Sequence, residues 1–334
     1  MEINSASTSR SQISTRDGAS EQQRRSLQIQ NVLVPLDFSA PSLRALEFAL
    51  PLIKHLGADL HLVHVFATDH PFSGLVGMPF VLPELEISRS IHKQLKDVAQ
   101  KYSIAIRPDN LHTIKGRAFE EICRLGRDTS IDLIVLATRG NTGLRHLALG
   151  STAERVVRYS SCPVLVMHGT KPAGGVPGFH KILVPVDFSE CSTQGLAYAK
   201  AFAKHFKSKI TLLNSVHFPY YVASDEYGRF DLPRLTQDAE IFARDQMRDL
   251  FEKTDWHGLE VETSLQSGHP GQQICEHARD SDVDLIVIST HGSTGLTHLL
   301  LGSVAEYVVR HAHCPVLVVP ARLSELQIHP TKQE

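Results

Sequence analysis

Two hydrophobic patterns alternate along the chain from residue 32 onward. Short, nearly continuous runs of Val, Ile and Leu predict strands buried on both faces of a sheet, at residues 32–34, 60–66, 111–115, 131–137 and 163–167. Between them, apolar residues spaced by about 3.6 positions predict amphipathic helices at residues 39–56, 84–102, 118–128 and 151–159. Residues 68–83, which contain Pro and Gly, are expected to form a long loop.

Strands that alternate with helices pair in parallel through right-handed crossovers. The pattern therefore predicts an α/β fold with an open, doubly wound parallel sheet of five strands. It then repeats, because residues 132–167 match residues 284–319 at 24 of 36 positions with an offset of 152, and residues 31–39 match residues 181–189 with an offset of 150. Two tandem copies of one domain are predicted.

The predicted boundaries follow from the repeat and from the composition between the copies. The first domain takes residues 30–168 and the second residues 180–320. A linker rich in Gly and Pro joins them at residues 169–179, and a tail occupies residues 321–334. Residues 1–29 are rich in Ser, Gln and Arg and are expected to be a disordered leader.

Charge and hydropathy narrow the set of partners. The 34 Lys and Arg residues nearly balance the 36 Asp and Glu residues, so we expect neither a nucleic acid nor a membrane partner. No apolar run approaches the roughly 20 residues of a membrane span, and no signal peptide is evident. We expect a soluble, cytoplasmic protein. An organellar transit peptide is the alternative for the leader, and Glu2, Asp17 and Glu21 count against it.

Cysteine and histidine residues suggest no metal or redox chemistry. The five cysteines form no CxxC motif, and Cys123 and Cys162 recur at the repeat offset. This favours small buried apolar residues over a redox pair between Cys162 and its counterpart Cys314. Of the 19 histidines, His146 and His298 repeat, but each stands alone in its segment rather than at ligand spacing. We predict no metal site among them.

Candidate site residues follow the first and fourth strands of each copy. In an open parallel sheet, ligands bind beyond the carboxyl ends of the strands where the strand order reverses. The candidates are Pro35, Asp37, Ala137, Gly140, Gly150 and Ser151 in the first copy, and Pro185, Asp187, Ser289, Gly292, Gly302 and Ser303 in the second.

The glycine-containing segment admits two interpretations. Glycines between residues 140 and 150 let the backbone turn tightly and approach a ligand, and the N-terminus of the following helix favours a phosphate. Alternatively, Ser151 with Glu154, and Ser303 with Glu306, form capping boxes that satisfy only the helix itself. Capping does not account for the glycines that occur in both copies. Asp37 likewise either caps the next helix or contacts a ribose or base.

The same segment resembles the G-x2-G-x9-G-[ST] hallmark of ATP-binding members of the universal stress protein family, in its tandem two-domain form. The resemblance covers residues 30–320, although Ala137 and Ser289 stand where the family has its first glycine. It implies a Rossmann-like, adenine nucleotide α-hydrolase-like fold. It also implies that the last strands of the two copies pair within the chain. The resemblance does not decide whether two whole chains form a homodimer. The positions that it implies for the adenine and ribose are Asp37, Val65, Asp187 and Ser215.

The leading hypothesis is a regulatory protein of stress adaptation that binds ATP or a related adenine nucleotide, with Mg²⁺ as its companion. Little or no hydrolysis is expected, because no Lys or Arg occupies the motif in both copies; Arg139 is matched by His291. One alternative is a nucleotide-free protein-interaction module of the same fold, supported by Ala137 and Ser289. An adenylyl-transferring enzyme is disfavoured because neither an SGGxDS-like loop nor an HxGH-like pair is present.

Overall fold

Helices and strands alternate through both copies close to the predicted positions. The computed structural model describes residues 29–67, 84–138, 149–168, 178–217, 232–290 and 301–321. The first copy contains β1 (Asn31–Pro35), α1 (Ala40–Leu56), β2 (Asp59–Phe66), α2 (Glu84–Lys101), the 3-10 helix η1 (Pro108–Asn110), β3 (Leu111–Lys115), α3 (Ala118–Asp128), β4 (Leu133–Ala137), α4 (Ser151–Tyr159) and β5 (Val164–Met167). The second copy contains β6 (Lys181–Pro185), α5 (Glu190–Phe206), β7 (Lys209–Val216), α6 (Leu232–Lys253), β8 (Val261–Ser267), α7 (Pro270–Asp280), β9 (Leu285–Ser289), α8 (Ser303–His311) and β10 (Val316–Val319).

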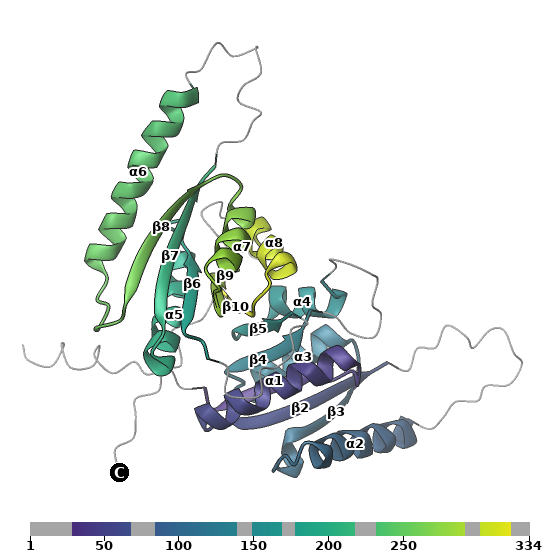
Figure 1. Cartoon of the computed structure of the whole chain (residues 1–334). Coiled ribbons are helices and arrows are strands. Elements are labelled where there is room, and N and C mark those ends of the chain that lie inside the picture. Colours follow the sequence, from purple (N-terminus) through teal and green to yellow (C-terminus); the bar gives the residue numbers. More distant parts are fainter. Residues whose placement is uncertain are drawn as a thin grey trace, which may run out of the picture.

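The strands of both copies form one continuous sheet of ten strands, in the order β3-β2-β1-β4-β5-β10-β9-β6-β7-β8 (Figure 1). Pairing is parallel within each copy, as the alternation of strands and helices predicts. The predicted α/β fold is confirmed, and the two five-stranded halves share one sheet.

The copies join through their last strands. β5 and β10 run antiparallel, with Leu165 opposite Leu317 and Val166 opposite Val316. All four side chains are fully buried. The pairing matches what the resemblance to the family implies, and it leaves β3 and β8 as the outer strands of the sheet.

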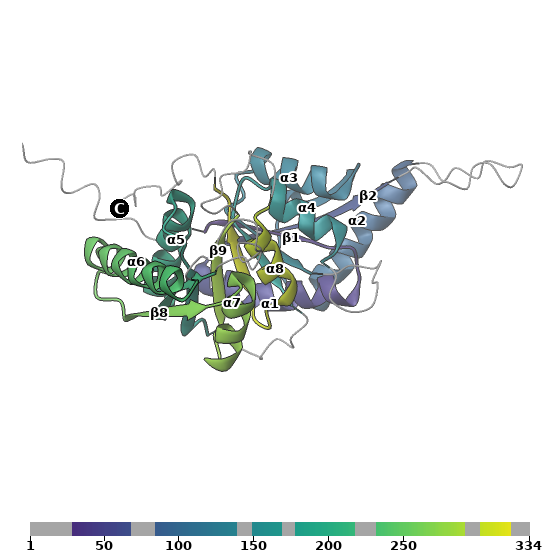
Figure 2. The same ribbon diagram turned by 90° about the horizontal axis from the view of Figure 1, so that it is seen from above.

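Helices cover both faces of the sheet (Figures 1 and 2). One hydrophobic core lies under α1, α2, α5 and α6, and the other lies under α3, α4, α7 and α8. Successive strand residues alternate between them, so that Val32 and Val34 enter the first core and Leu33 enters the second. Because each core contains residues from both copies, the hydrophobic interior is continuous across the junction.

Both copies begin with an anchoring apolar residue just before the first strand. Ile29, which the sequence assigned to the leader, is 6% exposed, and its counterpart Phe179, assigned to the linker, is 2% exposed. The Phe179 ring lies 6.2 Å from that of Phe48 in the first copy, measured between ring centroids. Residues 1–28, 68–83, 169–177 and 322–334, which contain most of the predicted leader, loop, linker and tail, lie outside the described residues.

Four of the five cysteine side chains behave as small apolar groups. Cys123, Cys162, Cys275 and Cys314 are buried free thiols. Burial raises the pKa of the Cys123 thiol to about 11 and that of Cys162 to about 12, so both stay protonated at neutral pH.

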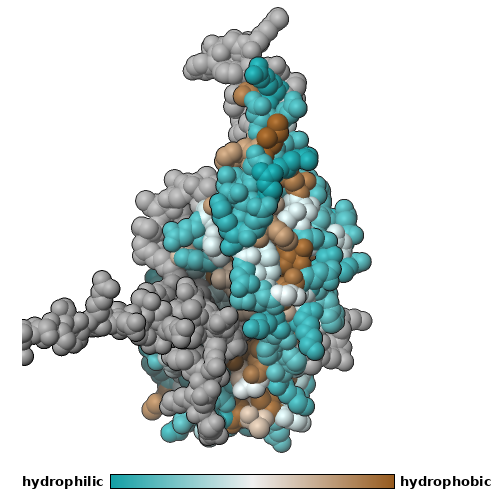
Figure 3. Space-filling model, turned by 90° about the vertical axis from the view of Figure 1, so that its left-hand side faces the viewer, coloured by the Kyte–Doolittle hydropathy of each residue, from teal (hydrophilic) through white to brown (hydrophobic). Residues whose placement is uncertain are grey.

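The outer side of the second copy is formed by α6, which packs beside β7 and β8. Figure 3 views the molecule from this side and shows apolar side chains among hydrophilic ones. The exposed large apolar residues of α6 include Ile241 and Phe242. Among the described residues, no helix combines the length and apolar character that a membrane span needs.

The first helix of each copy has matching caps with one difference. Ser39 and Ser189 cap α1 and α5 at their N-termini. Gly57 ends α1 in the left-handed region with φ 67°, whereas Lys207 occupies the same position of α5 with φ 55°. Left-handed backbone strains any residue that has a Cβ.

Replacing Lys207 with glycine is therefore expected to stabilise the protein. The gain should be about 0.5–1 kcal/mol, because glycine adopts the left-handed conformation without steric strain. Equilibrium unfolding in urea measures it. Lys207→Ala is the matched control, since it removes the charge but keeps the Cβ and should bring no gain. A Lys207→Gly variant no more stable than Lys207→Ala would contradict the strain argument.

Candidate functional site

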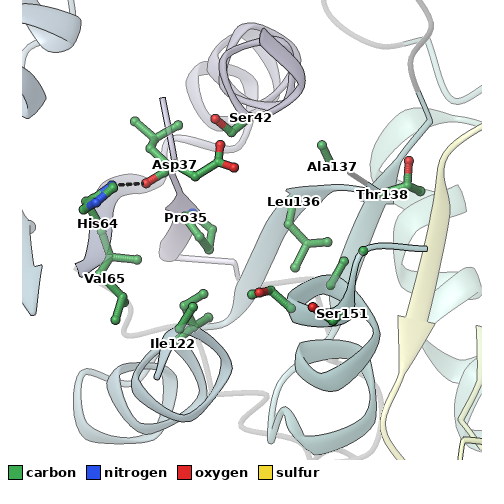
Figure 4. A pocket seen from close by; sticks show the side chains of 16 residues that line it. Pro35, Asp37, Ser42, His64, Val65, Ile122, Leu136, Ala137, Thr138 and Ser151 are labelled. Carbon is green, nitrogen blue, oxygen red and sulfur yellow. Dashed lines mark hydrogen bonds between the residues drawn. The ribbon is translucent and has the colours of Figure 1, made fainter. Parts of the chain in front are cut away.

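The strand order of each copy reverses between its first and fourth strands. β1 lies between β2 and β4 in the first copy, and β6 lies between β7 and β9 in the second. In the first copy a cavity of about 300 Å³ lies where these strands end (Figure 4). It is lined by Pro35, Leu36, Asp37, Ser42, Val63, His64, Val65, Ala118, Ile122, Leu136, Ala137, Thr138, Gly150, Ser151, Thr152 and Ala153.

Six of the residues proposed from the sequence meet around this cavity. They are Pro35, Asp37, Val65, Ala137, Gly150 and Ser151. Gly140, the remaining candidate of the first copy, lies outside the described residues, as does its counterpart Gly292. The structure thus brings together distant segments of the chain, with Pro35 and Gly150 separated by 115 residues in the sequence. That these residues bind a ligand stays a prediction.

The walls of the cavity differ in chemistry. Figure 4 shows His64 and Val65 on one side, Ala137 and Thr138 on the opposite side, and Ile122 with Ser151 along a third. Val65, Ile122 and Leu136 offer an apolar surface, while Asp37 and Ser151 add polar groups. An apolar surface with a few convergent polar groups is typical of small-molecule sites.

Asp37 is held by the turn between β1 and α1. Its Oδ1 accepts hydrogen bonds from the Ser39 N–H (3.0 Å) and the Ser39 Oγ (2.5 Å). Ser39, and not Asp37, caps the helix, because the Ser39 Oγ accepts a bond from the Ser42 N–H. The interpretation of Asp37 as the helix cap is therefore wrong. Asp187 holds Ser189 in the same way, at 3.1 and 2.6 Å.

The capping-box interpretation of the second segment is also wrong. Gly150 is the N-cap of α4 and Ser151 is its first residue, so the motif is displaced by one position, and no side chain caps this N-terminus. Glu154 instead forms ion pairs with Arg158 of its own helix (3.0 Å) and Arg310 of α8 (3.5 Å). α8 repeats the arrangement, with Gly302 as its N-cap.

Glycine at these N-caps is not required by the backbone conformation. Gly150 has φ −62° and ψ 141°, and Gly302 has φ −59° and ψ 142°. Any residue adopts these angles. The predicted need for a tight turn therefore does not apply at Gly150, and close approach to its backbone is the remaining reason for a glycine.

The ends of β4 and α4 are joined at the cavity. The Gly150 N–H donates to the Thr138 carbonyl at 2.6 Å, and the Gly302 N–H donates to the Thr290 carbonyl at 2.8 Å. Residues 139–148 and 291–300, which connect these ends and contain Arg139, His146, His291 and His298, lie outside the described residues. The bonds place the N-terminus of each helix beside the end of the fourth strand.

One wall of the cavity comes from α3, which contributes none of the residues proposed from the sequence. Ala118 and Ile122 of this helix line the cavity. Gly116 precedes the helix with φ 153°, and Gly268 precedes α7 with φ 136°. This glycine recurs at the repeat offset of 152 and, in each copy, lies two residues before the helix. It was the signal that could have identified the wall.

The candidate residues of the second copy occupy equivalent strand ends. Pro185 ends β6, Ser289 ends β9, and Ser303 begins α8. Ser215, the counterpart of Val65, donates its hydroxyl to the Gly268 carbonyl at 2.8 Å. The side chain at this position is therefore polar in the second copy and already bonded to the protein.

Comparison with known proteins assigns both halves of the chain. The model of the universal stress protein family matches residues 28–168 and again residues 178–320. The chain belongs to the universal stress protein family. Its two matches make it a tandem universal stress protein, as the repeated sequence predicts.

Similar proteins agree with this assignment. A universal stress protein of Methanocaldococcus jannaschii is 33% identical over 141 residues, which cover 42% of this chain and 82% of the relative. One of Mycolicibacterium smegmatis is 27% identical over 310 residues, covering 87% of this chain and 97% of the relative. The crystal structure of a universal stress protein from Archaeoglobus fulgidus has a TM-score of 0.61 at 22% identity, covering 89% of this chain and 98% of that one. The last likeness concerns the fold alone.

Proposed function

We propose that this universal stress protein binds ATP or a related adenine nucleotide at the candidate site of each copy, as a regulatory protein of stress adaptation in the cytoplasm. The observation that carries the proposal is the cavity at the end of β1 and β4, against which the uncapped N-terminus of α4 begins. Membership of the universal stress protein family supports the regulatory role.

The residues present suit the parts of an adenine nucleotide. The apolar surface of Val65 and Ile122 would hold the base, and the Asp37 carboxylate would accept hydrogen bonds from ribose hydroxyls. First-turn N–H groups of a helix lack acceptors within the helix and favour an anion, so the first turn of α4, which begins at Ser151, would hold the phosphates. Gly150, whose own N–H is bonded to the Thr138 carbonyl, would let them approach because it has no side chain. Mg²⁺ would accompany the triphosphate, whose oxygens are ligands it prefers.

Little or no hydrolysis is part of the proposal. Among the described residues that line the cavity there is no lysine or arginine. Phosphoryl transfer requires positive charge placed on the transferred group and a positioned water molecule. The described walls therefore support a site that binds a nucleotide rather than one that turns it over.

Titration calorimetry of the purified chain with MgATP tests the proposal. We expect saturable binding with a Kd in the micromolar range or tighter, at up to two sites per chain. Protein denatured after purification should first be analysed for nucleotide carried through it, because a tightly held nucleotide would mask binding. Protein that releases no nucleotide and binds none would overturn the proposal and favour the nucleotide-free interaction module.

A further inference from the structure

The same backbone carbonyl is held in both copies by a different side chain. In the first copy His64 Nδ1 donates to the Leu36 carbonyl at 2.7 Å, the bond drawn in Figure 4. In the second copy Asn214 Nδ2 donates to the Val186 carbonyl at 2.8 Å. His64 and Asn214 are equivalent positions, each 28 residues after the carbonyl that accepts the bond. We call this bond the carbonyl brace.

The carbonyl brace acts on the peptide that leads into the aspartate. Leu36 is held at its other end as well, because its N–H donates to the Val63 carbonyl at 2.8 Å, and Val186 repeats this bond with Leu213. In a trans peptide the C=O and the next N–H point in opposite directions. Fixing the Leu36 carbonyl toward β2 therefore turns the Asp37 N–H away from β2 and fixes where the Asp37 side chain begins.

The residue after the aspartate has a strained backbone conformation in both copies. Phe38 has φ 61° and Phe188 has φ 63°, a left-handed conformation that is strained for a bulky side chain. In the first copy the Phe38 ring stacks on the His64 imidazole, with ring centroids 4.7 Å apart and an interplanar angle of 18°. His64 thus contacts both residues that flank Asp37 in the chain, Leu36 and Phe38.

What the two brace residues share is one N–H donor and no charge. Burial lowers the pKa of His64, although the bond to the Leu36 carbonyl and the nearby Asp37 carboxylate partly offset this, so the imidazole is neutral at pH 7. A carbonyl only accepts, so the hydrogen is on Nδ1. Asn214 supplies an uncharged donor to the same place.

We propose that His64 and Asn214 are positioning residues, which direct Asp37 and Asp187 to the ribose and base of the bound nucleotide. The inference rests on the proposed function, and it concerns the adenosine part of the ligand. It predicts that either side chain serves in either copy, because the geometry needs only the donated hydrogen bond.

The test uses a Gly302→Val chain as the parent. This substitution is expected to remove the second site, so that ATP binding reports on the first site. His64→Leu, which keeps bulk but removes the donor, should weaken ATP binding about tenfold, the equivalent of one lost hydrogen bond. His64→Asn, the side chain of the second copy, should stay within about twofold of the parent, since the donor is restored. In a Gly150→Val chain, Asn214→Leu and Asn214→His should give the mirror result.

A second ligand separates positioning from general destabilisation. Inorganic triphosphate, used as a competitor, should keep its affinity in His64→Leu, because the affected contacts lie on the ribose and base. Adenosine should lose the same factor as ATP, whereas a generally destabilised site would weaken both competitors. Equal affinity of His64→Leu and its parent for ATP would overturn the inference and leave nucleotide binding in place. So would an Asn variant as weak as the Leu variant. A parent chain that binds no nucleotide would overturn both the inference and the proposed function.

Discussion

Valine in place of Gly150 is expected to abolish nucleotide binding at the first site, lowering its affinity by about 100-fold or more, while the second site keeps its own. Gly150 occupies the N-cap position of α4 at the edge of the cavity, where a phosphate would approach the backbone. Its dihedral angles of −62° and 141° suit valine, so the variant should fold. The number of ATP equivalents bound, measured by calorimetry, should fall by one.

The reciprocal variant provides the control. Gly302→Val places the same side chain on the equivalent backbone of α8, where φ is −59° and ψ is 142°, and should remove the other site. The double variant should bind no ATP and still unfold cooperatively in urea. If Gly150→Val binds as many equivalents as the unmodified chain, the N-terminus of α4 does not hold the phosphates.

Truncating a buried leucine at the junction between the copies should cause a large loss of stability. Leu165 of β5 lies opposite Leu317 of β10, and both are 0% exposed in the same hydrophobic core. Leu165→Ala is expected to lower the free energy of unfolding by about 2–5 kcal/mol, through lost apolar burial and the cavity left behind. Urea unfolding followed by circular dichroism measures the loss.

A double-mutant cycle tests whether the two copies act as one unit. Because Leu165 and Leu317 are direct partners, the loss in the double variant should differ from the sum of the single losses by about 0.5–3 kcal/mol. Leu85→Ala is the matched control, since Leu85 of α2 is 68% exposed and its truncation should change stability by less than about 0.5 kcal/mol. Strictly additive losses at the junction would contradict the coupling.

The repeat and the spacing of apolar residues predict the fold, because both are properties of the local sequence. Strand ends are predicted for the same reason, and with them the meeting of Asp37 and Gly150 at one edge of the sheet. The approach of these two segments follows from parallel pairing alone. No knowledge of individual side-chain contacts is needed for this part of the site.

Caps and braces could not be predicted, since they depend on a shift of one residue or on pairing between distant segments. Ser151 matches a capping motif whether it is the N-cap or the first helical residue, and only the backbone shows that Gly150 is the N-cap. His64 reaches the Leu36 carbonyl because β1 and β2 are in a particular register. Nothing in the sequence around His64 indicates that bond.

The antiparallel contact of β5 with β10 has a consequence for how the two halves can change. In an assembly of identical chains, a single altered codon appears in every subunit. Here each half meets a covalently tethered partner at a local concentration that dilution cannot lower, and a substitution enters only one half. The two halves have already diverged, because His64 in the first is replaced by Asn214 at the equivalent position of the second, and Val65 by Ser215. Tethering therefore lets one half acquire a substitution while the sequence of the other half stays unchanged.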